Sequence, residues 1–358
     1  MGYIVSIKTA IFIFPVLAFL ITVPYMIVNY RKYGSVNKLR TLIIYSFVLY
    51  LLTIYLLVIL PLPNLESIHT AYKDMLNLVP FSFAMDFIKD SPFTLSSPAT
   101  WVMALKHPSF YVPAFNILML IPFGIYLRYY FKCSFKKTML LTALLSLFFE
   151  LTQLSGLYFI YPGPYRLGDI DDIIQNTTGG CLGYVIGWFA VKLLPSREEI
   201  DEKALESGLR VSGIRICLSL IIDTVIVYIP YMISKTTLPL FSFIALYFSL
   251  IPLFNGKTFG SALLKFGIEF ENAKWIRTIL RGILLTAYFR LIPWGLIYIM
   301  NKSGKYAAEP LLFICLFVTA SLILLLYVIV TVAVVLLNRR LLFDRLSGTS
   351  YKSTVLNE

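Results

Sequence analysis

The chain has 358 residues, of which 58% are hydrophobic and 14% are charged, and it carries a net charge of +12. So apolar a composition excludes a soluble globular protein and indicates an integral membrane protein. On such a chain we interpret the basic excess as cytoplasmic loops and contacts with anionic headgroups, and we expect no nucleic-acid partner.

Apolar stretches of about 20 residues, the length that crosses a bilayer, predict about nine transmembrane helices. The stretches fall near residues 7–29, 42–62, 110–131, 138–159, 172–194, 213–234, 238–255, 279–300 and 311–337. The expected fold is therefore all-α, a polytopic membrane helical bundle. The first stretch lacks a small-residue cleavage site, so we expect it to remain as an anchor.

Lys and Arg residues cluster in alternate connections, within residues 29–40, 128–137, 192–210, 257–281 and 339–345. The positive-inside rule places these connections in the cytoplasm, with the N-terminus outside and the C-terminus inside. The expected location is the cell membrane, crossed many times. The segments 63–109 and 160–171 mix acidic and basic residues and are predicted to face outward.

Metal and cofactor sites are not predicted. His69 and His107 lie in the first outward segment without ligand spacing. The four cysteines lie in or beside apolar runs, where we interpret them as small core residues. We therefore expect no metal, no disulfide and no cofactor.

Polar side chains interrupt the fourth and fifth predicted helices. Glu150 and Gln153 lie one turn apart on one face, and Arg166 follows in the outer turn. A second set recurs at helical spacing as one stripe along the fifth helix: Asp169, Asp172, Asn176, Gly180, Gly183 and Gly187. The acidic and amidic end predicts an outward polar pocket, which Asn77 and Asn116 are expected to join. The glycines predict close helix packing.

Two interpretations of this stripe remain open. The aspartates that begin the fifth helix suit an N-cap and a first turn, and an ion pair between Glu150 and Arg166 would be a structural lock. Capping does not explain Glu150, Gln153 and Asn176 inside predicted spans, because polar groups there are costly and often functional. A functional outer pocket is the interpretation that we favour.

The order of these residues resembles the VanZ-like family over roughly residues 40–194. The pattern comprises NLVPF at 77–81, Asn116, Pro122-x-Gly124, Glu150-x-x-Gln153 and Arg166-x-x-Asp169-x-Asp171-Asp172-x-x-x-Asn176-x-x-x-Gly180-x-x-Gly183. The resemblance implies a bacterial membrane protein of a group associated with resistance to glycopeptide antibiotics such as teicoplanin. The Tyr- and Pro-rich segment 157–165 departs from that pattern.

Residues 195–210, PSREEIDEKALESGLR, are rich in charge and predict a cytoplasmic linker. The expected domains are then 1–194 and 211–350, followed by a tail at 351–358. The second half resembles the RDD family over roughly residues 208–350, for some members of which transport is suggested. The positions that carry the resemblance form an expected inner-face cluster: Arg215, Asp223, Thr258, Gly260 and Asp344. Ser261 stands where that family commonly has Lys.

A structural interpretation of this second cluster also remains open. Arg215 is expected to extend to the inner headgroups. Asp223 is expected to pair with Arg281 or Arg277 as a buried brace.

Three functions are compatible with the sequence. We favour a non-catalytic envelope protein whose outer pocket engages lipid-linked cell-wall material, a glycopeptide or lipid headgroups. The alternatives are a proton- or cation-coupled transporter and a membrane enzyme that uses the outer carboxylates. No nucleophile set or nucleotide fingerprint supports catalysis, and little polar sequence connects the two clusters.

Overall fold

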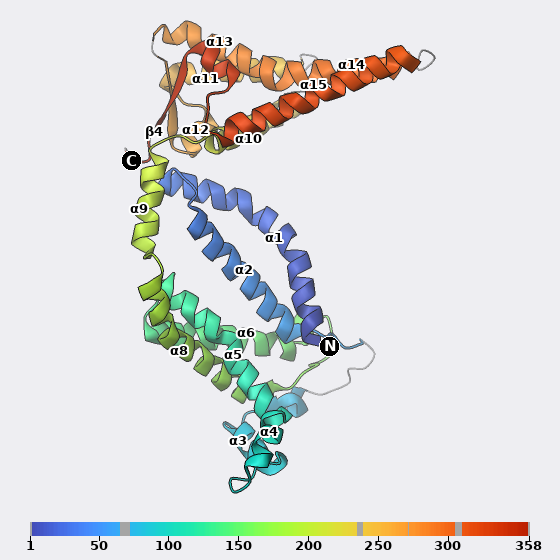
Figure 1. Ribbon diagram of the computed structural model, residues 1–358, viewed down its shortest axis with the longest axis vertical. Helices are drawn as coiled ribbons and strands as arrows, with labels where there is room; N and C mark the ends of the chain where they lie inside the picture. The colour runs from blue at the N-terminus through green and yellow to red at the C-terminus, as the bar shows by residue number, and fades with distance from the viewer. Residues whose placement is uncertain (1, 65–71, 235–238, 271, 305–309, 357–358) are drawn as a thin grey trace. The chain divides into compact units, whose positions relative to one another are not determined.

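The computed structural model describes residues 2–64, 72–234, 239–270, 272–304 and 310–356. The chain is mostly helical and divides into two compact units (Figure 1). Unit 1 comprises residues 1–20 and 38–200, and unit 2 comprises residues 21–37 and 201–358. The predicted all-α membrane bundle is confirmed.

Seven helical segments within the described residues are long and apolar enough to cross a membrane. They are α1 (Gly2–Tyr33), α2 (Lys38–Ile59), α5 (Pro108–Tyr129), α6 (Phe135–Leu154), α10 (Gly213–Ser234), the run Lys274–Ser303 and α15 (Pro310–Leu336). A pair bent by 44°, α8 (Ile170–Leu193) and α9 (Arg197–Gly208), makes an eighth if it counts as one span. The remaining predicted stretch, 238–255, forms α11 (Leu240–Asn255), whose 16 residues are short for a bilayer. The count of nine and the orientation stay predictions.

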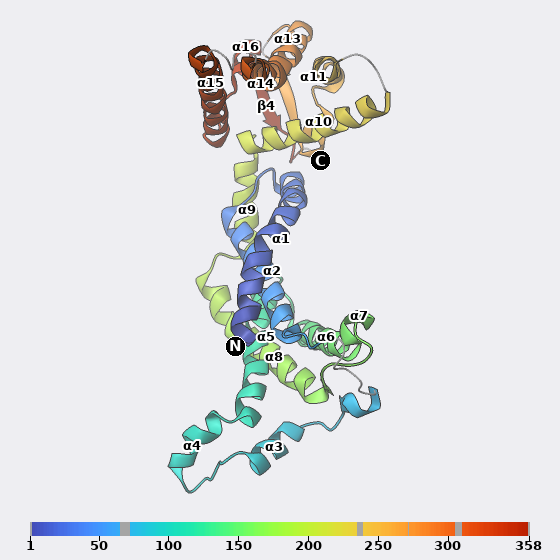
Figure 2. The same ribbon diagram turned by 90° about the vertical axis from the view of Figure 1, so that its right-hand side faces the viewer.

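Helices α5, α6 and α8 form the centre of unit 1 and lie side by side (Figure 2). Their apolar faces meet α2 in a core that includes Ile54, Leu120, Phe123 and Phe149. Helix α6 begins at Ser134, whose side chain accepts a hydrogen bond from the Lys137 N–H. These contacts place the polar start of α8 beside the first half of α5 and the last turns of α6.

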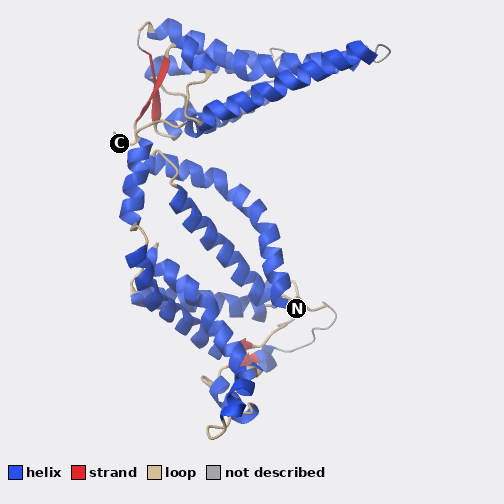
Figure 3. Cartoon of the chain, in the orientation of Figure 1, coloured by secondary structure: helices blue, strands red, loops and turns tan. Residues whose placement is uncertain are grey.

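A short parallel pairing ties the segment before α5 to the start of α8. Strand β1 (Leu76–Asn77) pairs with β2 (Gly168–Asp169), so that Asn77 lies opposite Asp169 (Figure 3). Around it lie the short helices η2 (Tyr72–Met75), α3 (Ser82–Asp90), α4 (Pro98–Leu105) and α7 (Gly156–Phe159). His69 lies outside the described residues. The ring of His107 caps α5, where it accepts a hydrogen bond from the Ser109 N–H.

In unit 2 the Lys274–Ser303 run consists of α13 (Lys274–Thr286), the π-helix η3 (Ala287–Leu291) and α14 (Ile292–Ser303). Two short helices, α12 (Phe259–Leu263) and α16 (Leu342–Ser347), complete the unit. Strand β3 (Phe266–Phe270) pairs antiparallel with β4 (Thr349–Ser353). The core includes Ile244, Phe248, Leu285 and Phe343. The segment predicted as a linker is thus mostly the helix α9, and the segment predicted as a tail begins inside β4.

Candidate functional site

Polar residues from α5, α6, α8 and the loop before α8 line a cavity of about 60 Å³ in unit 1. Six residues of the predicted outer pocket line it: Asn116, Glu150, Gln153, Arg166, Asp172 and Asn176. Apolar walls come from the ends of α2 and α5, including Leu57 and Phe115. We call this space the unit 1 polar cavity. Asn77 and Asp169, the other two predicted pocket residues, lie beside it.

The start of α8 is held by hydrogen bonds from two directions. Asp169 is the N-cap residue of α8, and its Oδ1 accepts from the Asp171 N–H at 2.9 Å. The Asn77 Nδ2 donates to both carboxylate oxygens of Asp169, at 3.2 Å each. The Asp169 N–H donates to Glu150 Oε2 at 3.0 Å. These bonds fix the orientation of the Glu150 carboxylate at the cavity wall.

Asp171 has a structural role that differs from the predicted one. Its carboxylate accepts from the Phe81 N–H at 2.5 Å, the Phe83 N–H at 3.0 Å and the Ser82 hydroxyl at 2.9 Å. These donors lie at the first turn of α3, whose N–H groups have no partner within the helix. The Asp171 side chain therefore caps α3, although it belongs to the first turn of α8.

The sequence analysis did not predict two polar residues of the site, Gln175 and Ser146. Asn116 Nδ2 donates to Asp172 Oδ1 at 2.6 Å and to Gln175 Oε1 at 2.9 Å. Asn176 Nδ2 donates to the hydroxyl of Ser146 at 2.8 Å. Gln175 follows Asp172 by three residues, and Ser146 precedes Glu150 by four. Helical spacing from a predicted residue was therefore the signal that would have found both.

The expected ion pair between Glu150 and Arg166 is not formed. Arg166 Nη1 instead donates to the carbonyl of Val58 at 2.9 Å, and Gln153 Nε2 donates to the same carbonyl at 2.7 Å. Val58 lies in the last turn of α2, where carbonyls lack partners within the helix and favour a positive charge. No ion pair to Glu150 occurs among the described residues, so its partner is a backbone N–H.

Three oxygen atoms around the cavity receive no hydrogen bond from any described residue. They are Glu150 Oε1, Asp172 Oδ2 and Asn176 Oδ1, the last of which is fully buried. Buried polar atoms normally have a partner, and an unpaired one calls for a ligand, an ion or water. The unmet chemistry of the cavity is hydrogen-bond acceptance. It suits a donor such as a hydroxyl, an ammonium or an amide N–H.

Residues 47–194 match the VanZ/LLP1 family model. The matched segment contains every residue that lines the unit 1 polar cavity, although it covers fewer than half of the 358 residues. Searches of curated proteins and of solved structures returned no match. The chain is therefore a membrane protein with a VanZ-like segment.

Glycines of the VanZ-like segment lie where α8 meets its neighbours. A Cβ atom added at Gly183 would overlap the Ile121 backbone of α5, and one added at Gly180 would overlap the Thr142 side chain of α6. A Cβ at Gly187 would meet Arg128 at 3.3 Å. Gly179, which the predicted stripe omitted, approaches the Ile117 carbonyl as Gly183 approaches Ile121.

The second polar cluster lies outside the VanZ-like segment, in unit 2. Asp223 is fully buried and accepts four hydrogen bonds. The donors are the Tyr247 hydroxyl at 2.7 Å, the Thr258 hydroxyl at 2.6 Å, the Gly260 N–H at 2.6 Å and the Ser219 hydroxyl at 3.4 Å. The expected brace from Asp223 to Arg281 or Arg277 is therefore wrong. Asp223 instead joins α10 to α11 and to the start of α12.

The start of α12 explains how Ser261 is used. The Thr258 side chain accepts from the Ser261 N–H, and the Ser261 hydroxyl accepts from the Thr258 N–H at 2.8 Å. This reciprocal capping box satisfies two N–H groups of the first turn. It also aims the Thr258 hydroxyl at Asp223.

Arg215 is buried, and no carboxylate of the described residues pairs with it. Its guanidinium donates to four backbone carbonyls, of Gly34, Gly208, Leu264 and Lys265, at 2.6–3.1 Å. It also donates to the Ser353 hydroxyl at 3.3 Å. The expectation that Arg215 reaches lipid headgroups is therefore wrong, because its side chain is inaccessible.

Arg281, Asp344 and Tyr351 form a buried triad. Arg281 Nε lies 3.2 Å from Asp344 Oδ1, and the Tyr351 hydroxyl donates to the same oxygen at 2.7 Å. Arg281 Nη2 donates to the Tyr351 hydroxyl at 2.9 Å. Burial raises the pKa of Asp344, which Arg281 partly opposes, and burial also raises the pKa of Tyr351. Thus Asp344 and Asp223, which were assigned to one inner cluster, share no partner among the described residues.

Proposed function

We propose that the chain is a non-catalytic membrane protein of VanZ type whose unit 1 polar cavity engages a donor-rich group of lipid-linked cell-wall material. The observation that carries the proposal is the set of unmet acceptors, Glu150 Oε1, Asp172 Oδ2 and Asn176 Oδ1, around one cavity in the VanZ-like segment. Sugar hydroxyls, amino groups and peptide N–H groups of cell-wall material are donors of the matching kind.

The size of the cavity limits what enters it. Its volume of about 60 Å³ exceeds the roughly 10–15 Å³ that one water needs, yet it is far below the 300–1,000 Å³ typical of ligand pockets. Only the tip of a ligand, such as one hydroxyl or ammonium group, fits without rearrangement. The remainder of the ligand would then rest outside, against the loop segments that precede α5 and α8.

The predicted orientation supports an external ligand. The positive-inside rule puts the polar ends of α6 and α8 at the outer face, where cell-wall material is assembled. A link to glycopeptide tolerance, including teicoplanin, would follow if the same acceptors held the antibiotic or its target. This link rests on the VanZ resemblance together with the chemistry of the cavity.

Transport and catalysis are supported less well by the contacts. Asp223, the expected inner carboxylate of a transport path, already accepts four hydrogen bonds and so has no vacant position for a passing cation. Ser146, the hydroxyl of the site, is buried and is held between Asn176 and the Asp172 carbonyl. It is therefore a poor nucleophile.

For unit 2 we propose an RDD-type architecture. Its support is the contact of Asp223 with both Thr258 and the Gly260 N–H, three of the positions that carry the resemblance. Arg215 and Asp344 make separate contacts, and the VanZ match ends at residue 194. This proposal concerns the fold of unit 2 and assigns it no activity.

Binding to a lipid-linked disaccharide–peptide precursor in nanodiscs tests the proposed function. Glu150→Gln and Asp172→Asn remove charge with little change of shape, and we expect each to weaken binding by roughly tenfold or more. Asp86→Asn, an exposed carboxylate change in α3, is the matched control and should bind like the unsubstituted protein. Unchanged binding in both cavity variants, or no binding by the unsubstituted chain, would refute the proposal.

A second test compares Asn176→Ala with Asp171→Ala in a glycopeptide-tolerance assay. Asn176→Ala should abolish any teicoplanin tolerance while the protein remains in the membrane at its normal abundance. Asp171→Ala should lower abundance, because three donors at the start of α3 lose their acceptor. If Asn176→Ala lowered abundance as much, its role would be structural.

A further inference from the structure

An arginine without a partner among the described residues interrupts an apolar helical run. Arg290 belongs to η3 and follows Lys274 by 16 residues in the Lys274–Ser303 run, about 24 Å along a helix. No described residue lies within hydrogen-bond or ion-pair distance of its guanidinium, in contrast to Arg215 and Arg281. A charged side chain within a span normally pairs or marks a functional site.

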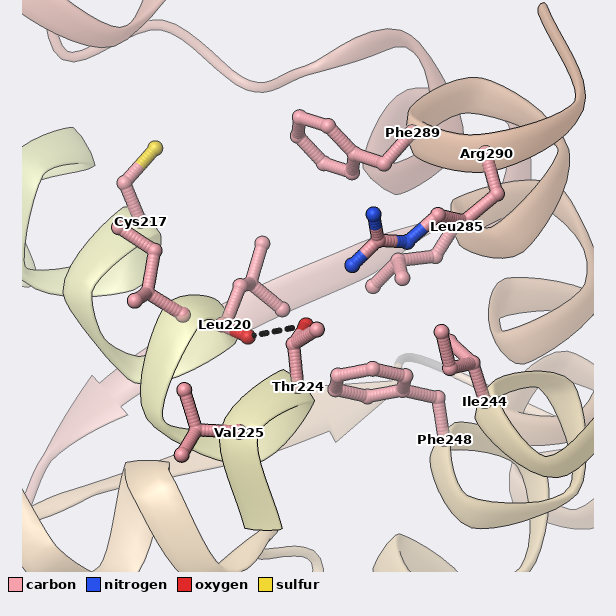
Figure 4. Close-up of a pocket in the computed structure, with 10 residues that line it drawn as sticks. Cys217, Leu220, Thr224, Val225, Ile244, Phe248, Leu285, Phe289 and Arg290 are labelled. Atoms are coloured by element: carbon pink, nitrogen blue, oxygen red, sulfur yellow. Dashed lines mark hydrogen bonds between the residues drawn. The ribbon is translucent and has the colours of Figure 1, made fainter. Parts of the chain in front are cut away.

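Arg290 borders a cavity of about 390 Å³ in unit 2. The walls are apolar and come from α10, α11 and α13, with Leu220, Ile244, Phe248 and Leu285 among them. Figure 4 shows the guanidinium of Arg290 reaching into this space towards Leu220 and Thr224. It is the one charged side chain among the ten described residues that line the cavity.

The hydroxyl proton of Thr224, at the cavity wall, is already engaged in a hydrogen bond. The Thr224 hydroxyl donates to the Leu220 carbonyl at 2.7 Å, within its own helix (Figure 4). Hydrogen-bonding capacity inside the cavity is therefore concentrated at the five N–H donors of one guanidinium. An occupant must present an anion at that point and apolar surface elsewhere.

The cavity opens onto apolar surface. Ile221 and Val225 line it and are 60% and 54% exposed. On a helix that crosses a membrane, exposed residues of this kind face lipid. An occupant therefore enters from the bilayer, which makes an amphiphile a better fit than a soluble anion.

The backbone around Arg290 is also unusual. Pro293, at the start of α14, has no N–H to continue the helical ladder, and the preceding turn is a π-helix. Single π-turns place an extra residue in the helix and occur often at functional sites. Here the π-turn contains Phe289 and Arg290, which both line the cavity.

We propose that this cavity binds one anionic phospholipid of the surrounding membrane, with its phosphate on Arg290 and an acyl chain along the apolar walls. A phosphate matches the planar fork of a guanidinium. The volume lies within the range of about 300–1,000 Å³ that is typical of ligand pockets. The proposal concerns unit 2 alone and does not depend on the unit 1 polar cavity.

Photocrosslinking of the full chain in nanodiscs tests this site. The probes are phosphatidylglycerol and phosphatidylcholine, each with a diazirine on one acyl chain, and mass spectrometry locates the crosslinks. We expect phosphatidylglycerol to label residues 217–225 and 285–290 several-fold more than phosphatidylcholine does. Arg290→Gln should reduce that labelling roughly tenfold, and Arg290→Lys, which keeps the charge, should reduce it less.

Two further variants separate binding from folding. Arg339→Gln removes an exposed arginine that does not line the cavity, so its labelling should match the unsubstituted protein. Thr224→Phe fills the cavity while Arg290 remains, and it should suppress labelling by both lipids. Equal labelling in Arg290→Gln and the unsubstituted chain, or equal labelling by both lipids, would overturn the proposal. Competition by a free fatty acid but not by phosphatidylglycerol would also overturn it.

Discussion

At the scale of single residues, the two buried arginines of unit 2 are stabilised in different ways. Arg281 has a carboxylate and a phenol, whereas Arg215 has carbonyls and one hydroxyl. A buried ion pair contributes little net stability, but the loss of one partner leaves an uncompensated charge. The two sites should therefore respond differently to substitution.

Arg281→Met should destabilise the protein by about 3–5 kcal/mol, because Asp344 would stay buried without its cation. Asp344→Leu should have a similar cost, since Arg281 would lose its carboxylate. The double variant should be more stable than the sum of the single effects predicts, because neither charge remains. Denaturant unfolding of the detergent-purified protein measures all three. Strict additivity would show that the two side chains do not interact.

Which residues are polar inside spans could be read from the sequence, but their partners could not. Glu150, Asp172 and Asn176 were identified, and the structure brings them to one cavity. Arg166 was expected to meet Glu150 because the two are near in sequence, yet it meets the end of α2 instead. Similarly, the donors that bind the Asp171 carboxylate lie 88–90 residues away, at the start of α3. Such contacts depend on how the loops between helices fold. Helical periodicity gives no information about that.

At the scale of elements, the approach of α5 to α8 depends on positions that have no side chain. Gly124, Gly179 and Gly183 would each overlap a backbone atom of the facing helix if they carried a Cβ. Without water to drive association, membrane helices associate through such close packing. The polar cavity lies near one end of this contact, so its shape depends on the helix spacing.

Gly183→Ala and Gly295→Ala form a matched pair of substitutions with opposite expected effects. Gly183→Ala should lower stability by about 1–3 kcal/mol, because the rigid backbone of Ile121 cannot move aside. Gly295 in α14 has nothing within 4 Å of its added Cβ, so alanine should be neutral or raise stability by up to about 1 kcal/mol. Thermal unfolding in detergent measures both. Equal effects would contradict the packing argument.

Helix positions were predictable because an apolar stretch of span length has few alternative structures. The limits of the prediction lie in the polar segments. The strands β3 and β4 are separated by 78 residues, so no local turn signal joined them.

At the scale of the whole molecule, the charged segment 195–210 is not the only boundary between the two units. Residues 21–37 belong to unit 2, although residues 1–20 of the same helix belong to unit 1. Arg215 illustrates the reason, because one of its acceptors is the carbonyl of Gly34. A fragment cut at residue 194 would separate these two residues.

Cysteine accessibility tests the predicted orientation. In a background with the four native cysteines replaced by serine, Ser96→Cys should react with an impermeant thiol reagent in intact cells. Lys203→Cys should react only after the membrane is permeabilised, since basic connections face the cytoplasm. Both positions are exposed. The reverse pattern would place the unit 1 polar cavity inside and remove the argument for an external ligand.

The antiparallel pairing of β3 with β4 also determines when unit 2 can complete its fold during translation. The Ser353 hydroxyl that Arg215 uses is translated 138 residues later, and the Tyr351 hydroxyl that Arg281 uses is translated 70 residues later. Both arginines therefore leave the ribosome before these partners exist. Until β4 is made, Arg281 and Asp344 lack the Tyr351 hydroxyl that bridges them, and Arg215 lacks one of its acceptors. Nascent unit 2 should accordingly stay open to chaperones and membrane proteases until residues 349–353 have emerged.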